Sequence, residues 1–532
     1  MERVAPRQVL YENQLPLAIE STSSRRIFFP EGGGSVYGPT GGGANPNIVR
    51  IPINSDDLLD PTESFLQFKF TNRSGDTMAL DTGVPFIRRM RIESSGTTLE
   101  DINEYGRLYA QLVACQSSQG AMSEATLTTG GTTAPSGALT ATAAFTAANI
   151  GAVATTASNA AFTAANLATA VGLNNATTVI ADAVNAAVGV SVAGTIATAR
   201  AAINTQIDLN LADIRAKVDA KQVNFGGHHP NQAQVADGAS VYYNVPLVSA
   251  LLNSMKYLPL LFMNGGLVLE LEIDTAFSAG GFVAAANAVN WDISNVRYIA
   301  HMISLQRDFY DKLRMVMEGS GGVLQLAGTT YRHFQSTYAD ATSVSVPLPA
   351  KVKSLKGLLF TETNPDDVDS THFYIGDSLS NGLGEYQLRV GSVLYPPTSI
   401  KLDNTGAAGV YENKGEAYQE LRKLFGTLGD YTHGGVMINN STFLVGRPDV
   451  DSVSERGGAV VPGVINPKGL ALDAFPRTNL ESGLNSADQN LSMSLELKRV
   501  PRAGGGNTRL DMWCMCDAIF YVNLDGSVSS SV

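Results

Sequence analysis

Apolar and polar residues alternate with a period of two over residues 267–273. The apolar face consists of Leu267, Leu269, Leu271 and Ile273, with acidic residues among those on the other face. This period predicts a β-strand with one face in a core and the other facing water or a partner. A second strand is predicted from Trp291 to residue 303. A third is predicted over 241–247, which is rich in β-branched and aromatic residues, and the apolar spacing over 248–258 predicts a helix after it.

The same pattern recurs near the C-terminus. Apolar residues alternate again over 491–497, where Leu495–Leu497 repeats the Leu-Glu-Leu of Leu269–Leu271. A strand is then predicted to begin at Trp513, as the earlier one begins at Trp291, and the two matches have nearly the same offset along the chain. Two consecutive strands with similar offsets indicate that one β-rich unit is present twice.

Further elements follow from the same periodicities. Strands are predicted over 65–70, 85–94, 323–334, 351–363, 385–397 and 443–448. Helices are predicted where apolar residues recur at helical spacing, over 98–112, 304–319 and 416–425. In the first helix Thr98 is the predicted N-cap, and Glu100 and Asp101 suit the positive end of the helix dipole. We therefore interpret this acidic pair as capping residues and not as a catalytic pair.

The composition changes abruptly after the first predicted helix. From 125 to 199 there is one charged residue, and the heptapeptide Ala143–Asn149 is repeated at Ala160–Asn166. The low content of charge and proline favours a small, closely packed projection over a disordered tract. Because β-patterning resumes at Val241, we interpret 118–225 as an insertion in a surface loop of the first β-unit.

The overall charge excludes some classes of partner. The 532-residue chain has a formal net charge of −12 at pH 7. Broad nucleic-acid binding needs clustered Lys and Arg, so no direct, sequence-specific nucleic-acid binding is expected.

The best candidate for a membrane span, 247–273, is interrupted by Lys256, Pro259 and Asn264, so no span is predicted. The N-terminal residues lack the apolar core of a signal peptide, which predicts synthesis without export.

Residue types that carry chemistry in other proteins are present here without the spacing that such chemistry needs. The three cysteines do not form a disulfide framework. Cys514 and Cys516 share a predicted strand face with Ala518, Phe520 and Val522, which favours burial over a metal or redox role.

The remaining candidates favour structural interpretations as well. Arg89 and Arg91 fall on one face of a predicted strand, which favours a solvated or subunit-facing surface. The acidic loop 366–369 lacks the calcium-loop spacing, and the His pair 228–229 lacks metal-ligand spacing. No catalytic residue, metal ligand or cofactor is therefore predicted.

Three runs carry a resemblance to a known family: FIRRMRIESSGTTLEDINEYGRLYAQL, YNVPLVSALLNSMKYLPLLFMNGGLVLELEI and CDAIFYVNLDG. They resemble the double jelly-roll major capsid proteins of double-stranded DNA viruses, most closely those of virophages and polinton-like viruses. The similarity covers most of 48–300 and, more loosely, 320–525. The resemblance implies a homotrimer whose six rolls form a pseudo-hexagonal capsomer. It also implies loop insertions that form an outer tower, where we place 118–225.

Pattern and resemblance together predict a mainly β fold with two tandem antiparallel jelly-roll sandwiches and short helices between strands. The predicted domains are an N-terminal arm over 1–45, a first jelly roll over 46–303 with the inserted segment 118–225, a linker helix over 304–322, and a second jelly roll over 323–532.

The expected function is structural and not enzymatic. The chain is expected to be a major capsid protein that self-associates into trimeric capsomers and tiles an icosahedral virion shell. Its expected partners are neighbouring capsomers, penton proteins and minor capsid proteins. One alternative is a surface or fibre-type adhesin with the Ala/Thr-rich tract as a stalk, which should carry an export signal. Another is a carbohydrate-active jelly-roll enzyme, which would need exposed tryptophans and a carboxylate pair in a groove.

Overall fold

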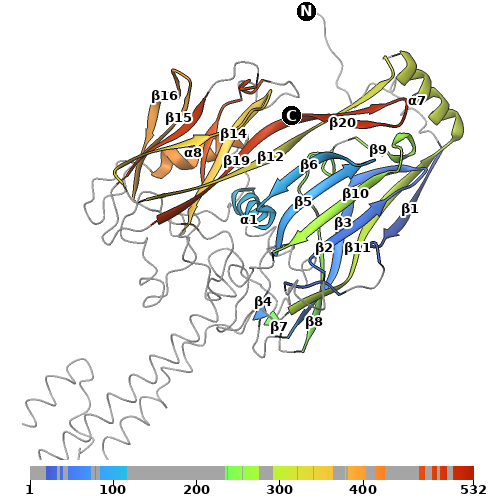
Figure 1. The fold of residues 1–532 in the computed structure, drawn as a ribbon. Coiled ribbons are helices and arrows are strands. Elements are labelled where there is room, and N and C mark those ends of the chain that lie inside the picture. Colours follow the sequence, from blue (N-terminus) through green and yellow to red (C-terminus); the bar gives the residue numbers. More distant parts are fainter. Residues whose placement is uncertain are drawn as a thin grey trace, which may run out of the picture. The chain divides into compact units, whose positions relative to one another are not determined.

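The computed structural model describes most of residues 20–116, 234–274, 291–402, 414–425, 467–487 and 492–532, with short gaps inside these ranges. The described residues form two β-sandwiches, each made of two antiparallel sheets (Figure 1). None of the described helices is long and apolar enough to cross a bilayer.

The first sandwich combines the sheet β1-β11-β3-β8 with the sheet β2-β10-β5-β6. Its strands are β1 (Ser21–Phe28), β2 (Ile48–Ile53), β3 (Leu58–Asn72), β5 (Ile87–Ser94), β6 (Thr97–Asn103), β8 (Ser240–Val245), β10 (Leu267–Ile273) and β11 (Trp291–Leu305). Smaller elements complete it: α1 (Tyr105–Gln116), β9 (Leu258–Pro259) beside β3, the 3-10 helix η4 (Leu260–Phe262), and the pair β4 (Met78–Ala79) and β7 (Gln234–Val235).

The second sandwich combines the sheet β12-β19-β14-β17 with the sheet β13-β18-β15-β16. Its strands are β12 (Val323–Ala339), β13 (Ser343–Leu348), β14 (Leu355–Thr363), β15 (Leu383–Val390), β16 (Val393–Lys401), β17 (Lys468–Ala471), β18 (Met493–Arg499) and β19 (Asn507–Asn523). Helix α7 (Arg307–Gly319) precedes it, α8 (Lys414–Leu424) lies between β16 and β17 in the chain, and β20 (Val528–Ser531) pairs with β19.

The two sandwiches have the same connectivity. When the eight main described strands of each are numbered in chain order, one sheet runs 1-8-3-6 and the other 2-7-4-5, with a helix between strands five and six. This is the strand order of a jelly roll, so the fold is a double jelly roll, as predicted. The strands whose sequences repeat, β10 and β18, and then β11 and β19, hold equivalent positions in the two rolls.

The predicted alternation sets which side chains enter the core. The aliphatic face of β10, from Leu267 to Ile273, is at most 2% exposed. Strands β3, β5, β12 and β14 confirm the strands predicted at their positions. Alternate residues of β3 and β5 enter the core cluster, whereas β14 contributes the consecutive residues Leu358, Leu359 and Phe360. The sandwiches thus form because period-two apolar faces are buried against each other.

Two of the predicted helices differ from the structure. Residues 97–103 form β6 because Ser95 and Gly96 both take positive φ and close a hairpin with β5, so Thr98 lies in a strand and does not cap α1. The described residues of 248–257 form turns and irregular structure, in which the Ser249 Oγ accepts hydrogen bonds from the N–H groups of residues 251 and 252, and Leu258 begins β9. In both stretches, local hydrogen bonding and tertiary packing override the helical spacing.

Two strand predictions and one domain boundary also need correction. Residues 385–397, predicted as one strand, form the hairpin of β15 and β16, which turns at Gly391 with φ +58°. Strand β1 lies inside 1–45, the predicted arm, so the first roll begins before residue 46. Trp513 lies within β19 and not at its start.

Helices α7 and α8 confirm the helices predicted over 304–319 and 416–425. In α7, Met317 is buried whereas Val316 is 60% exposed, because the helix covers the roll with a narrow stripe. The insertion 118–225, the strand 443–448, the acidic loop 366–369 and the His pair 228–229 lie outside the described residues.

Candidate functional site

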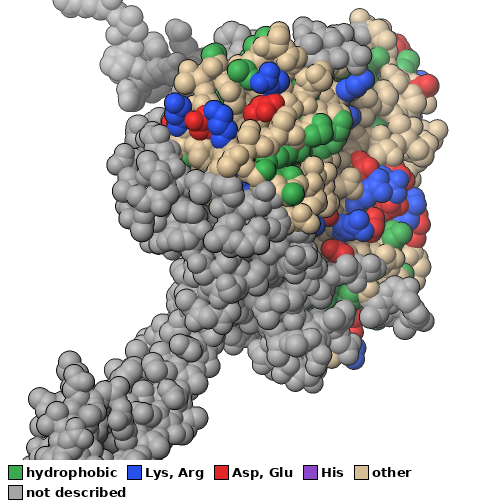
Figure 2. Space-filling view, turned by 60° about the vertical axis from the view of Figure 1, so that its left-hand side comes forward, with side chains coloured by type: hydrophobic (Ala, Val, Ile, Leu, Met, Phe, Trp, Pro, Cys, Tyr) green, Lys and Arg blue, Asp and Glu red, His purple; other side chains and the backbone are tan. Residues whose placement is uncertain are grey.

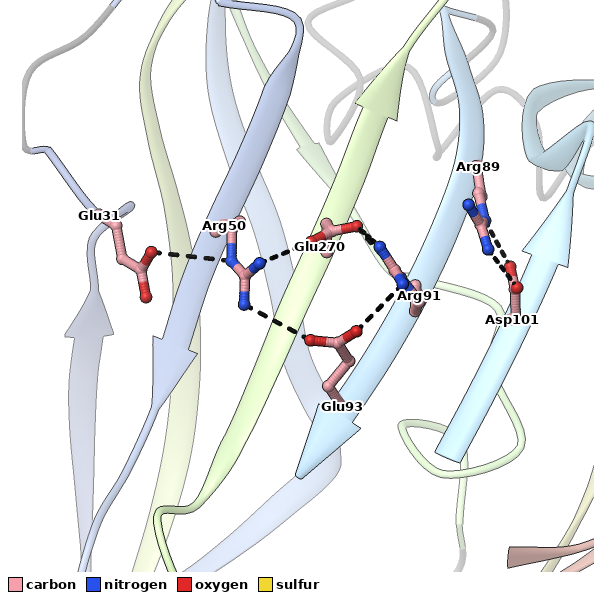
Figure 3. A network of polar contacts seen from close by, with 7 residues as sticks. All are labelled: Glu31, Arg50, Arg89, Arg91, Glu93, Asp101 and Glu270. Atoms are coloured by element: carbon pink, nitrogen blue, oxygen red, sulfur yellow. Dashed lines mark hydrogen bonds and ion pairs between the residues drawn. The ribbon is translucent and has the colours of Figure 1, made fainter. Parts of the chain in front are cut away.

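The outer face of the sheet β2-β10-β5-β6 carries a network of ion pairs (Figure 3). The register places Glu270 of β10 opposite Arg50 of β2 on one side and Arg91 of β5 on the other. Oppositely charged residues that face each other across strands attract. Arg50 Nη1 lies 3.1 Å from Glu270 Oε2, Arg91 also pairs with Glu270, and Arg91 Nη1 lies 3.2 Å from Glu93 Oε1.

The network extends to both sides of this centre. On β5, the Arg89 guanidinium donates two hydrogen bonds of 2.7 and 2.5 Å to Asp101 of β6, and this contact raises the pKa of Arg89. At the other end Glu31 lies 3.7 Å from Arg50. Arg89 and Arg91 therefore share one face, as predicted, and both are paired with acidic residues of the same sheet.

The second roll has a similar but more exposed charged face. Lys498 Nζ of β18 lies 3.0 Å from Glu385 of β15, and Arg389 Nε lies 3.2 Å from Glu496. The side chains of Lys498 and Arg389 are 67% and 50% exposed, against 27% for Arg91 in the first roll. Figure 2 shows that basic and acidic side chains are interspersed on the described part of the surface it displays.

The junction between the rolls contains a buried glutamate. Glu100 of β6 is 4% exposed and accepts hydrogen bonds from Ala250 N (2.9 Å) and from the Ser249 hydroxyl, both in the first roll. It also accepts one of 2.7 Å from the hydroxyl of Thr330, in β12 of the second roll. Burial raises the pKa of this carboxyl, although these hydrogen bonds oppose the shift. Glu100 was predicted to cap a helix; instead it joins the rolls.

A second polar cluster joins the rolls beside α1. Asp511 of β19 accepts a hydrogen bond of 2.9 Å from Arg509 and lies 2.9 Å from His333 Nε2. The Arg509 guanidinium also lies 3.2 Å from Glu104, the residue before α1 in the first roll. Burial alone would raise the pKa of Asp511, but the bond with His333 and the charges of Arg509 and Arg107 lower it to about 2.

The junction is close-packed where the backbones meet. A Cβ on Gly328 of β12 would lie 2.3 Å from the carbonyl oxygen of Ala250, so glycine is required for this approach. Every described side chain of α1 is buried or half-buried. Figure 1 shows α1 on the side of the first roll that faces β12 and β19. The two rolls therefore meet in an interior-like interface.

The sulfur and imidazole groups have structural surroundings. Cys514 and Cys516 are buried as predicted, and burial raises the pKa of both thiols, that of Cys516 to about 12. His333 contacts Asp511, and His301 lies 3.6 Å from Asp60. Among the described residues, no three His, Cys, Asp or Glu side chains are grouped so as to hold a metal ion.

The sequence has no match among protein-family models or among curated proteins. The structure is similar to a chain of the PBCV-1 virus capsid, in a quasi-atomic model, with 10% identity, 98% of this chain and 99% of that chain covered, and a TM-score of 0.51. It also matches the mavirus major capsid protein, with 10% identity, 100% and 95% coverage, and a TM-score of 0.45. The first likeness, over nearly the full length of both chains, agrees with the fold read from the strand order.

Proposed function

We propose that this chain is a major capsid protein that self-associates into trimeric, pseudo-hexagonal capsomers and tiles an icosahedral virion shell. The observation that carries this proposal is the duplication: two rolls of identical strand order are joined by a close-packed junction with buried polar contacts. Three such chains supply six similar rolls. A ring of six similar units is the simplest way in which a closed trimer matches a hexagonal lattice.

The sheet faces support the proposal. Each roll presents a charged outer face in which the ion pairs lie within the sheet, so that little unpaired charge opposes contact with another copy. Obligate interfaces typically bury more than about 2,000 Å². Broad, rigid sandwich sides can supply such areas, whereas a binding or catalytic function would instead favour a concave site with converging polar groups.

The charge balance and the chemistry agree with a shell protein. A net charge of −12 suits a protein that does not itself bind the genome. The polar clusters of the described residues are used in fold and junction contacts, and we infer no enzymatic activity. Penton and minor capsid proteins are the partners we propose beyond the capsomer itself.

Electron microscopy of the purified full-length chain tests the function. We expect negatively stained particles of uniform size with threefold symmetry and a hexagonal outline. The same sample should form ordered arrays or closed shells when concentrated or when co-expressed with its penton partner. Particles that contain a single pair of sandwiches, at every concentration examined, would contradict the proposal.

A further inference from the structure

The helices α1 and α8 are counterparts in the two rolls, yet their exposure differs. Both follow the fifth strand of their roll and pack onto its core through residues such as Leu108 in α1 and Leu421 in α8. No described side chain of α1 is exposed, whereas α8 exposes one stripe: Gly415, Glu416, Gln419 and Lys423. These residues recur at helical spacing and form one continuous face.

The cover on α1 comes from the second roll of the same chain. Strand β12 packs beside β6, where Thr330 bonds to Glu100, and Arg509 of β19 reaches Glu104 at the start of α1. Within α1 itself, the charge of Arg107 acts on Asp511 of β19, so the buried helix α1 lies beside the next roll along the chain. Among the described residues, no strand covers the exposed stripe of α8 in this way.

The matching surface in the first roll is also exposed. Strand β1 holds the place of β12, and within the described residues the one strand it pairs with is β11. Its residues Ser21–Arg26 are exposed, and Phe29, which follows the strand, is 57% exposed. The two exposed surfaces also carry residues of opposite charge, since α8 exposes Glu416 and β1 exposes Arg25.

We propose that the exposed stripe of α8 binds the β1 side of a second copy of this chain, so that the junction inside each chain is repeated between chains. This inference rests on the proposed function and specifies its interface. The contact is heterologous, since α8 of one copy meets β1 of the next, and such contacts form a ring when the rotation closes. With two rolls per chain, three copies complete a ring of six.

Two single variants test each side separately. Gln419→Trp places a bulky side chain in the α8 stripe, and Phe29→Glu places a charge on the β1 side. Lys312→Trp on the exposed face of α7 is the matched control for added bulk. We expect light scattering at micromolar concentration to give a trimer for the wild type and the control. Each test variant should give single chains of 56.1 kDa with an unchanged circular-dichroism spectrum.

A mixture of the two variants distinguishes this contact from others. One intact α8 stripe and one intact β1 side remain in such a pair, so equimolar Gln419→Trp and Phe29→Glu chains should form a one-to-one dimer that cannot close. If either variant fails to fold, Glu416→Arg or Arg25→Glu replaces it on the same surface.

The outcomes separate this inference from the proposed function. Trimers in both test variants, or no heterodimer in the mixture of two monomeric variants, would overturn the α8–β1 contact while leaving a trimeric capsomer intact. A monomeric wild type would instead overturn the capsomer proposal, and the α8–β1 contact with it.

Discussion

The two rolls differ in their cores at the pairing of the third and sixth strands. In the first roll, Phe68 of β3 faces Tyr243 of β8 across the ladder, and the two rings stack with centroids 5.4 Å apart. In the second roll, Phe360 of β14 faces Lys468 of β17. Lys468 Nζ lies 2.7 Å from Glu362, and both side chains are fully buried. One strand order thus accommodates an aromatic cluster in one copy and an ion pair in the other.

This difference shows what the fold requires of its core. The apolar period fixes which positions point inward, but it does not require every inward residue to be apolar. A charged residue is tolerated when its partner is also buried and further hydrogen bonds satisfy the pair. Here the Tyr338 hydroxyl donates a hydrogen bond to Glu362, and the Arg499 guanidinium lies 5.3 Å from the Tyr338 ring centroid.

Breaking the buried pair should have the largest effect. Lys468→Met keeps the length of the side chain but leaves Glu362 charged without its cationic partner. We expect a loss of about 3–5 kcal/mol in the free energy of unfolding, measured by denaturant titration. The matched change in the first roll is Tyr243→Phe, which removes a buried hydroxyl that has no hydrogen-bond partner. It should change stability by less than about 1 kcal/mol, and equal losses in both variants would refute the comparison.

Removing a polar contact at the junction between the rolls should have the next largest effect on stability. Glu100→Ala leaves the Ala250 N–H and the Thr330 hydroxyl without their acceptor, at a cost of about 2–3 kcal/mol. Because Thr330 belongs to the second roll, the loss should also uncouple the rolls. We expect calorimetry to resolve two thermal transitions where the wild type shows one. A single, unshifted transition would show that this contact contributes nothing to coupling.

Acidification should affect the two buried glutamates in opposite directions. Burial opposes ionisation of Glu362, but the charge of Lys468 and the hydrogen bonds from Lys468 and Tyr338 bring its pKa below the ordinary value. The contribution of ionised Glu362 to the free energy of unfolding is therefore complete above the unfolded pKa of about 4.3. This contribution is lost as pH falls through the lower folded pKa. Burial raises the pKa of Glu100, so its contribution falls as pH rises from about 4.3 through the raised folded value.

The variant Glu100→Gln isolates the second effect. Its amide oxygen can still accept the bonds from Ala250 and Thr330, but the group cannot ionise. We expect the free energy of unfolding, measured from pH 4 to pH 8, to decline less with rising pH above about 4.3 than in the wild type. Identical slopes would show that folding does not raise the pKa of Glu100, and would contradict the effect of its burial.

Much of the fold could be predicted because period-two alternation is a local signal. The strands β10 and β18 and the strands that follow them revealed the duplication from sequence alone. Strand β1 was missed because it is a polar, exposed edge strand without an apolar face. Residues 97–103 were misassigned because their apolar residues also fit a helical spacing.

The junction and the buried ion pair could not be predicted in the same way. A glutamate in a strand, such as Glu100 or Glu362, is ordinarily expected on the solvent side. Its burial depends on partners far along the chain, Thr330 in one case and Lys468 in the other. No local pattern encodes these pairings, since they arise when the sheets pack.

The smallest effect is expected for the Ala/Thr-rich tract. If 118–225 is an insertion in a surface loop, deleting residues 125–199 and joining the ends should leave both rolls folded. The thermal midpoint should change by no more than a few degrees, consistent with the weak dependence of loop-closure entropy on length. Insoluble protein from this deletion, alongside a soluble full-length control, would place the tract in the core.

The central claim is that a duplicated jelly roll closes into a ring of six rolls. Native mass spectrometry of the full-length chain at micromolar concentration tests it most directly. We expect one dominant species with three times the 56.1 kDa chain mass, stable on dilution. A dominant single-chain species, or a dimer that does not convert to a trimer as concentration rises, would contradict it.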